Sequence, residues 1–472
     1  MANMDSRFLL NTPFSAWPAE VKAQLVDAVE HTPLWPRGST GEAVPSGSSV
    51  VYFDFPPHLL FFSGPETYFD ITFTFSKPPL GNSLERRPLD ESDKKVLVLV
   101  ENFVAHAFTR FQFLVNNIPV RTDGFADRGL AMIEDFIGCH LREDAKVMMS
   151  TSDMEPFYNT YLHNTEWKLA STRWENYAAK LWNGESRGVT VSYRPMCFPF
   201  MTAFSPKDTY VIPSMNQQLS VACYIDPGLN NIYTLHPDTT AGYTVALSSM
   251  SLNLSYARLS PAGERAITGS PSKGLAEYPG TFIYQQPVFV TKGDRQVIVN
   301  FPNAHMPTGI LVQAYSADML ATGKKVTSSP RHRPIDPNLQ EYSVKFNDTD
   351  VYTNNVNPGK LTNSDMKLLA RRRLYLNPFF DLPVHQDVGK NEIPATTYNM
   401  PHVYIDCTNG AGQPIQTVNP SPDPKKGKLA VTLTGKSNGG LAEFYMVNLI
   451  YKGCGVLIDR ARRSFINSYF TA

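Results

Sequence analysis

Apolar and polar residues alternate with a period of two through residues 243–259, a pattern typical of a β-strand with one buried face. The apolar positions are Val245, Leu247, Met250, Leu252, Leu254 and Tyr256. At Ser248-Ser249 the alternation slips by one residue, which predicts a β-bulge. A similar segment, residues 443–459, lies close to the end of the sequence. We predict that these two segments are the last strands of two successive β-sandwiches.

Shorter segments with strand character are distributed over the rest of the chain. In the clearest, residues 69–75, four apolar side chains alternate with Asp70, Thr72 and Thr74. Further strands are predicted at 51–55, 96–100, 111–115, 219–225, 282–290, 297–301, 310–315 and 342–353. Aromatic residues make up 12% of the chain and there are 37 prolines, which favours strands joined by rigid loops over a helical bundle. The predicted fold class is therefore all-β.

A few segments have helical spacing instead. Residues 129–141 and 166–182 carry apolar stripes, and another helix is predicted from Asn363 or Ser364 to about residue 377. We expect these helices to be inserted in long loops between strands.

The N-terminal arm, residues 1–45, also has helical spacing. Trp17, Val21 and Leu25 recur on one face after a cap at Ser15, and the stripe continues to Ala28/Val29. Two interpretations stay open: the helix packs on its own domain, or the arm docks on a neighbouring subunit or an inner layer.

Two local similarities indicate that the fold is duplicated. LVNNIPVRT (residues 114–122) matches KFNDTDVYT (residues 345–353), and the strand pair beginning QLSVACYID (218–226) matches the pair beginning KLAVTLTGK (428–436). Similarities in the same order predict two copies of one fold, here a tandem jelly roll. The predicted parts are the arm (1–45), a first jelly roll (46–262), a linker (263–278), a second jelly roll (279–460) and a C-terminal tail (461–472).

Composition narrows the classes of function. Lys+Arg and Asp+Glu both number 43, so the formal net charge is zero and a globally basic nucleic-acid binder is disfavoured. The five cysteines are odd in number and contain no CxxC pair, which argues against a disulfide framework and a zinc site. Neither a signal peptide nor an apolar stretch of membrane-spanning length occurs, so we expect synthesis in the cytosol and no membrane span.

The residues do not predict catalysis. Residues 435–439 read G-x-S-x-G, but a nucleophile elbow requires a helix after the serine, and a strand-like segment follows here. We interpret this stretch as a hairpin turn. No catalytic residue, metal site or cofactor is proposed.

Clusters of basic residues are the remaining candidate sites. One combines Lys324-Lys325 with Arg331 and Arg333. Two denser clusters consist of Arg371, Arg372 and Arg373, and of Arg460, Arg462 and Arg463. Each cluster is either a solvated face or a surface that contacts packaged DNA or an acidic inner protein.

Several segments, taken in order, carry a resemblance to a known family. They are SVVYFDFPPHLLFF (49–62), ENFVAHAFTRFQFLVNNIPVRT (101–122), MPTGILVQAYSADMLATG (306–323), Asn377-Pro378-Phe379, and the closing pair LAVTLTG (429–435) and FYMVNLIYKGCGVLIDR (444–460). Over roughly residues 50 to 460 the chain resembles the double jelly-roll major capsid proteins of icosahedral DNA viruses. It is most similar to those of Maverick/Polinton-like elements and adintoviruses, with virophage proteins and adenovirus hexon further away.

The resemblance implies two tandem antiparallel jelly-roll β-sandwiches with short helices inserted in loops, and a structural protein that is not an enzyme. It implies a homotrimer with a pseudo-hexameric outline that tiles an icosahedral shell in the virion, with assembly in the nucleus or cytoplasm. Penton or minor capsid proteins and packaged DNA are further expected partners. The alternative is a two-domain β-sandwich carbohydrate-binding protein or glycoside hydrolase, since the proximity of two catalytic carboxylates is a property of the folded chain.

Overall fold

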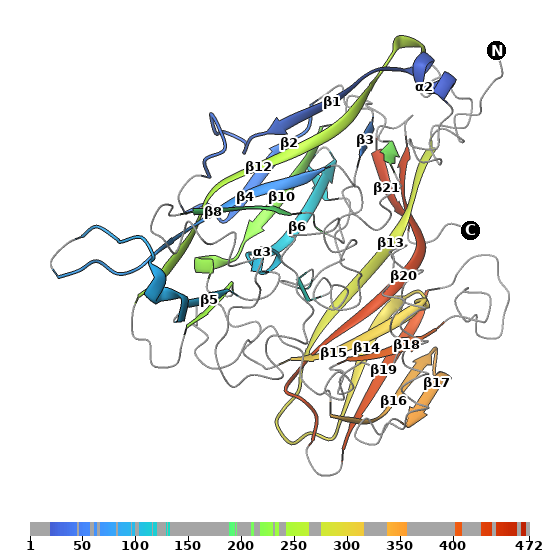
Figure 1. Cartoon of the computed structure of the whole chain (residues 1–472). Coiled ribbons are helices and arrows are strands. Elements are labelled where there is room, and N and C mark those ends of the chain that lie inside the picture. Colours follow the sequence, from blue (N-terminus) through green and yellow to red (C-terminus); the bar gives the residue numbers. More distant parts are fainter. Residues whose placement is uncertain are drawn as a thin grey trace, which may run out of the picture.

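The computed structural model describes residues 19–56, 61–132, 188–263, 275–315, 338–355, 402–407 and 426–468, with gaps inside several of these ranges. Most elements in these ranges are β-strands in antiparallel sheets, which confirms the all-β prediction (Figure 1). The helices are short: α2 (Ala19–Leu25), η2 (Glu91–Lys95), α3 (Phe103–His106) and η3 (Pro227–Leu229). None of the described helices is long and apolar enough to cross a membrane.

The first roll consists of a six-stranded and a four-stranded sheet with a small two-stranded addition. The six-stranded sheet contains β8 (Gly188–Tyr193), β4 (Tyr68–Ser76), β12 (Thr244–Leu259), β3 (Phe61–Ser63) and β9 (Thr209–Val211), with β1 (Val26–Leu34) paired to β12. The four-stranded sheet has the order β2 (Val50–Asp54), β10 (Leu219–Ile225), β6 (Phe108–Val115), β7 (Ile118–Pro119). The addition pairs β5 (Leu97–Leu99) with β11 (Tyr233–Leu235).

The second roll consists of a five-stranded and a four-stranded sheet. The five-stranded sheet has the order β13 (Leu275–Phe289), β20 (Phe444–Asp459), β15 (Gly309–Tyr315), β18 (His402–Asp406), with β21 (Ser464–Ser468) paired to β20. The four-stranded sheet has the order β14 (Gln296–Ala304), β19 (Gly427–Gly435), β16 (Leu339–Phe346), β17 (Thr349–Asn355).

Both rolls have the same topology. In the order β1, β2, β4, β6, β7, β8, β10, β12 the strands of the first roll correspond one by one to β13 through β20 of the second. In each set the last strand lies between the first and the third, and the seventh lies between the second and the fourth. This is the strand order of a jelly roll, so the predicted duplication is confirmed.

The predicted strands and their details agree with the structure where the alternation is clear. Alternate residues of β4 are buried, as expected for a strand with one face in the core. The pairing of β12 with β4 shifts between Leu247 and Ser249, which confirms the bulge predicted at Ser248. The Ser248 hydroxyl donates a hydrogen bond of 3.1 Å to the carbonyl of Thr72.

The matched segments of the repeat form equivalent hairpins. Strands β6 and β7 are joined at residues 116–117, and β16 and β17 at residues 347–348. Asn117, Asn347 and Asp348 have φ angles of 62°, 49° and 62°, as a tight two-residue turn requires. Asn and Asp tolerate this left-handed conformation better than other residues with side chains, which explains why both copies use them.

The N-terminal prediction is wrong in its second half. Helix α2 ends at Leu25, and residues 26–34 form strand β1, which pairs with the C-terminal half of β12 from Val26–Leu259 to Leu34–Leu252. Hydrogen bonds to β12 stabilise the extended conformation, and the spacing of apolar residues contains no information about that partner. Because β1 corresponds to β13, the sheets of the first roll begin inside the predicted arm.

The second roll likewise begins early, since β13 starts at Leu275, within the predicted linker. Of the helix predicted at 129–141, Gly129, Ala131 and Met132 are described, and they are helical. The helices predicted at 166–182 and after Asn363 lie outside the described residues.

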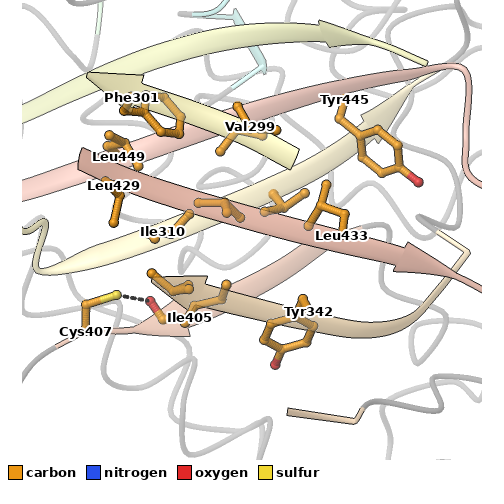
Figure 2. Packing of buried hydrophobic residues seen from close by; sticks show 14 of the residues in the cluster. Val299, Phe301, Ile310, Tyr342, Ile405, Cys407, Leu429, Leu433, Tyr445 and Leu449 are labelled. Atoms are coloured by element: carbon orange, nitrogen blue, oxygen red, sulfur yellow. Dashed lines mark hydrogen bonds between the residues drawn. The ribbon is translucent and has the colours of Figure 1, made fainter. Parts of the chain in front are cut away.

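The core of the second roll lies between its two sheets (Figure 2). Val299 and Phe301 of β14 and Leu429 and Leu433 of β19 come from one sheet, while Ile310, Ile405, Tyr445 and Leu449 come from the other. The first roll has an equivalent aromatic core, in which the rings of Phe69 and Phe111 have centroids 5.8 Å apart.

Candidate functional site at the junction of the two rolls

Gly129 and Met132 of the first roll contact the outer face of the five-stranded sheet of the second roll. Met132, in the segment between β7 and β8, forms a fully buried cluster with Tyr315, Phe444 and Met446. Along β20, Tyr445, Val447 and Leu449 point into the core of the roll, so the alternate residues from Phe444 onwards face the junction. Burial on both faces explains why FYMVNLIY (444–451) is a nearly uninterrupted apolar run rather than an alternating one.

Three buried amides on neighbouring strands of this face form a connected network. The Asn448 Nδ2 donates hydrogen bonds to the Leu311 carbonyl at 3.0 Å and to Gln313 Oε1 at 3.2 Å. The Gln285 Nε2 donates to Asn448 Oδ1 at 2.7 Å. Exposed fractions of 6%, 0% and 0% for Gln285, Gln313 and Asn448 place the whole network away from water. The three amide nitrogens all donate hydrogen bonds within the protein, which offsets the cost of burying them.

The network also binds the backbone of the first roll. Gln285 Nε2 donates a hydrogen bond of 3.0 Å to the Gly129 carbonyl, and Gln313 Nε2 donates one of 3.4 Å to the Met132 carbonyl. A Cβ atom at residue 129 would overlap the Gln285 amide, so glycine leaves the space that this side chain occupies. Apolar packing and directional hydrogen bonds together fix one roll against the other.

A second polar cluster ties the loop after β4 to the start of β12 in the first roll. The ammonium of Lys77, only 7% exposed as a residue, forms ion pairs with Asp90 and, at 3.0 Å, with Asp93. The Tyr243 hydroxyl donates a hydrogen bond of 2.6 Å to Asp93 Oδ1. These contacts hold both ends of the loop at residues 77–93 in place.

The ionisation of this cluster follows from its hydrogen bonds. The side-chain hydrogen bond from Lys77 lowers the pKa of Asp90 to about 2, with a further contribution from Ser92. Burial by itself lowers the pKa of Lys77, but hydrogen bonds to Asp90 and Asp93 outweigh it, and the pKa is raised. Burial, and then the hydrogen bond to Asp93, raise the pKa of Tyr243. The carboxylates of Asp90 and Asp93 are therefore both bound by the Lys77 ammonium.

Of the arm contacts predicted from the sequence, Val21 and Leu25 lie in α2 and are partly buried. The turn that contains Leu25 is bound to its own chain, since Ser260 donates its N–H to the Leu25 carbonyl at 2.9 Å and its hydroxyl to the Gln24 carbonyl at 2.8 Å. Trp17 lies outside the described residues, as do Arg371, Arg372, Arg373, Arg460, Arg462 and Arg463. Lys324, Lys325, Arg331 and Arg333 are outside as well.

The structure also shows the surroundings of the G-x-S-x-G stretch at residues 435–439 and of the residues that could bind a metal ion. Strand β19 ends at Gly435, a bridge joins Lys436 to Gly440, and strand β20 follows, so the G-x-S-x-G stretch connects two strands rather than a strand and a helix. Among the described residues, His, Cys, Asp and Glu do not gather in groups of three or more that could hold a metal ion.

Sequence reasoning did not identify Gly129, Gln285, Gln313 or Asn448. The available signal was the loss of alternation around Asn448, since a single amide inside an apolar run indicates a strand buried on both faces.

Comparisons with known proteins support the same architecture. No protein-family model and no curated protein matches this sequence. Among solved structures, the chain is similar to one from the Sputnik virophage, determined by cryo-electron microscopy, with a TM-score of 0.57 and 10% identity over 100% of this chain and 94% of that one. It is also similar to the mavirus major capsid protein, with a TM-score of 0.51 and 12% identity over 98% of this chain and 96% of that one.

The fold is therefore the double jelly roll of viral major capsid proteins. The resemblance noted in the sequence is confirmed at the level of fold, and the similarity extends over nearly the whole length of both chains.

Proposed function

We propose that this chain is the major structural protein of an icosahedral capsid, and that three copies associate into a pseudo-hexameric trimer. The observation that carries the proposal is the duplication of one jelly roll, with the same strand order, in a single chain. A ring with a sixfold outline needs six similar units, and three chains with two rolls each supply them.

The junction supports this function because a shell requires subunits of fixed shape. If the rolls could rotate freely, the ring would close only at a large cost in conformational entropy. Packing around Met132 and the hydrogen bonds of Gln285 and Gln313 fix the angle between the rolls within each chain. The alternative, a glycan-binding or glycan-cleaving protein, gains no support from any described residue.

Light scattering after size-exclusion chromatography and negative-stain electron microscopy test the proposal. We expect a particle of about three times the chain mass of 52.7 kDa, and shells or arrays at high concentration. A monomer that forms no shell and binds or hydrolyses glycans would overturn the proposal.

Packaged DNA, penton proteins and minor capsid proteins are the partners of such a capsomer in the virion. The arginines at 371–373 and 460–463 are the proposed inner-face contacts. Arg371→Glu should reduce the salt dependence of DNA retention, with Lys292→Glu, on an exposed turn of the second roll, as a matched charge reversal. An identical salt slope for the two variants would exclude this role for the cluster.

A further inference from the structure

The duplication allows the same face to be compared in the two rolls. In the second roll, the outer face near the start of β20 is buried by the first roll. Strand pairing identifies the equivalent positions in the first roll, where β4 corresponds to β15 and β12 to β20. Tyr315–Phe444 corresponds to Ser76–Thr244, and Gln313–Met446 corresponds to Thr74–Ala246.

The two equivalent faces differ in side chains and in exposure. Phe444 and Met446 are large, apolar and 0% exposed. At the matching positions of the first roll, Thr244 and Thr74 are small, polar and only half-buried, and Ala246 is exposed. Hydroxyl pairs continue this character across the sheet, with Thr72 and Thr190 at 2.8 Å and Ser76 and Thr244 at 2.7 Å. The face that is covered in the second roll is therefore open in the first.

A loop with exposed leucines lies beside the open face. Residues 78–81 and 84–89 project from the end of β4 away from the second roll (Figure 1). Leu84 is 98% exposed and Leu80 is 64% exposed. The loop is attached to the face itself, because the Arg86 Nη1 donates hydrogen bonds to Thr244 Oγ1 at 2.7 Å and to the Gly242 carbonyl at 3.2 Å.

We infer that this open face, defined by Thr74, Thr244 and Ala246 together with the leucines of the neighbouring loop, binds a second copy of this chain. This inference rests on the proposed trimer and names the surface that closes it. The neighbouring copy occupies, on the first roll, the place that the first roll occupies on the second. Alternating contacts within and between chains then continue the same packing around the ring.

Three features favour a second copy over other occupants. In a ring with a sixfold outline each roll meets the next after a similar rotation, so the contact between chains should resemble the junction within the chain, where the face of the second roll is covered. A face that must stay soluble until subunits meet is expected to be small and polar, whereas the permanent junction within the chain is apolar. The nearby cations also turn back onto their own chain, since Arg87 Nε donates to the Pro78 carbonyl at 3.0 Å. A membrane or nucleic-acid surface would leave such cations free to face outwards.

The test substitutes the face without touching the core. Ala246→Arg places a long cation at an exposed position, so the isolated chain should fold, but the cation would be buried without a partner in the contact. We expect the trimer dissociation constant to rise by at least about a hundredfold. Ala246→Ser, which keeps the side chain small, should leave the trimer intact. Analytical ultracentrifugation over a dilution series measures both, and far-ultraviolet circular dichroism confirms folding.

A trimer that survives Ala246→Arg at the dilutions where the parent protein is trimeric overturns the inference while the proposed function stands. If the parent protein is a monomer and forms no shells, the proposed function fails, and the inference with it. Should Ala246→Arg not fold, Leu84→Asp decides, with Leu84→Met as its control. A trimer that persists in Leu84→Asp then overturns the inference.

Discussion

Replacement of Asn448 by alanine is the most direct test of the junction. The substitution removes the donor to the Leu311 carbonyl and to Gln313 Oε1, and the acceptor of the hydrogen bond from Gln285. Asn448 and Gln313 are 0% exposed, so water does not reach the groups left behind without a rearrangement. Each unsatisfied buried polar group costs about 1–3 kcal/mol.

With two glutamine groups losing a partner, we expect Asn448→Ala to destabilise the second roll by about 3–5 kcal/mol. For a domain of this size, about 3 kcal/mol corresponds to a decrease in Tm of roughly 6–12 °C. The junction should loosen as well, because the same glutamines donate to the carbonyls of Gly129 and Met132.

Asn300 supplies the matched control, since it lies on strand β14 of the same roll and is exposed. Asn300→Ala should change the free energy of unfolding by less than about 0.5 kcal/mol. Urea unfolding followed by circular dichroism compares the two variants, and hydrogen exchange reports on residues 129–132. Equal stability of the two variants, with unchanged exchange at the junction, would refute the reasoning.

Three further predictions concern the junction and the polar cluster of the first roll. Gly129→Val should displace the Gln285 amide and cost about 1–3 kcal/mol in thermal unfolding, whereas Gly41→Val, where an added Cβ meets no atom within 4 Å, serves as a test of glycine replacement without that contact. Because Lys77 lowers the pKa of Asp90 to about 2, the stability that Asp90 contributes is present above its unfolded pKa of about 4 and is lost as the pH falls from there towards 2. Lys77→Met should remove this part of the acid dependence, and a stability profile with the same slope between pH 4 and 2 would contradict the assignment. Tyr243→Phe removes a hydrogen bond of 2.6 Å to a buried carboxylate and should lower stability by about 1–3 kcal/mol by differential scanning calorimetry, with no change expected for half-buried Tyr52→Phe beyond about 0.5 kcal/mol.

Elements whose signal lies in their own residues could be predicted from the sequence. In β4 and β12 one face is buried and the other partly exposed, so the residue types alternate, and the bulge is visible as a slip in that alternation. The turn at Asn347-Asp348 was missed, because the strand predicted at 342–353 runs through it, whereas the structure has two strands, β16 and β17, that pair across the turn. These local signals sufficed to identify the duplication and hence the fold.

Elements that depend on a distant partner could not be predicted in the same way. The extended conformation of β1 is stabilised by pairing with residues 252–259, more than two hundred positions later in the chain. The spacing of Val21, Leu25 and Val29 fits a helix equally well. The junction amides have the same difficulty, because a glutamine in a strand ordinarily faces solvent, and its burial here depends on Gly129 and Met132.

The two copies of the roll differ in their outer faces, whose surroundings also differ. Their inner faces face equivalent cores, and both remain apolar, as Met250 and Leu252 in β12 and Val447 and Leu449 in β20 show. The outer faces do not have equivalent surroundings before assembly, because the second is covered as soon as its chain folds and the first remains open to water. The covered face of the second roll must therefore pack within the chain, whereas the open face of the first roll must stay soluble in water. In the proposed ring both faces would form the same kind of contact. The polar character of the first roll's outer face is therefore the character expected of the contact between chains that we propose.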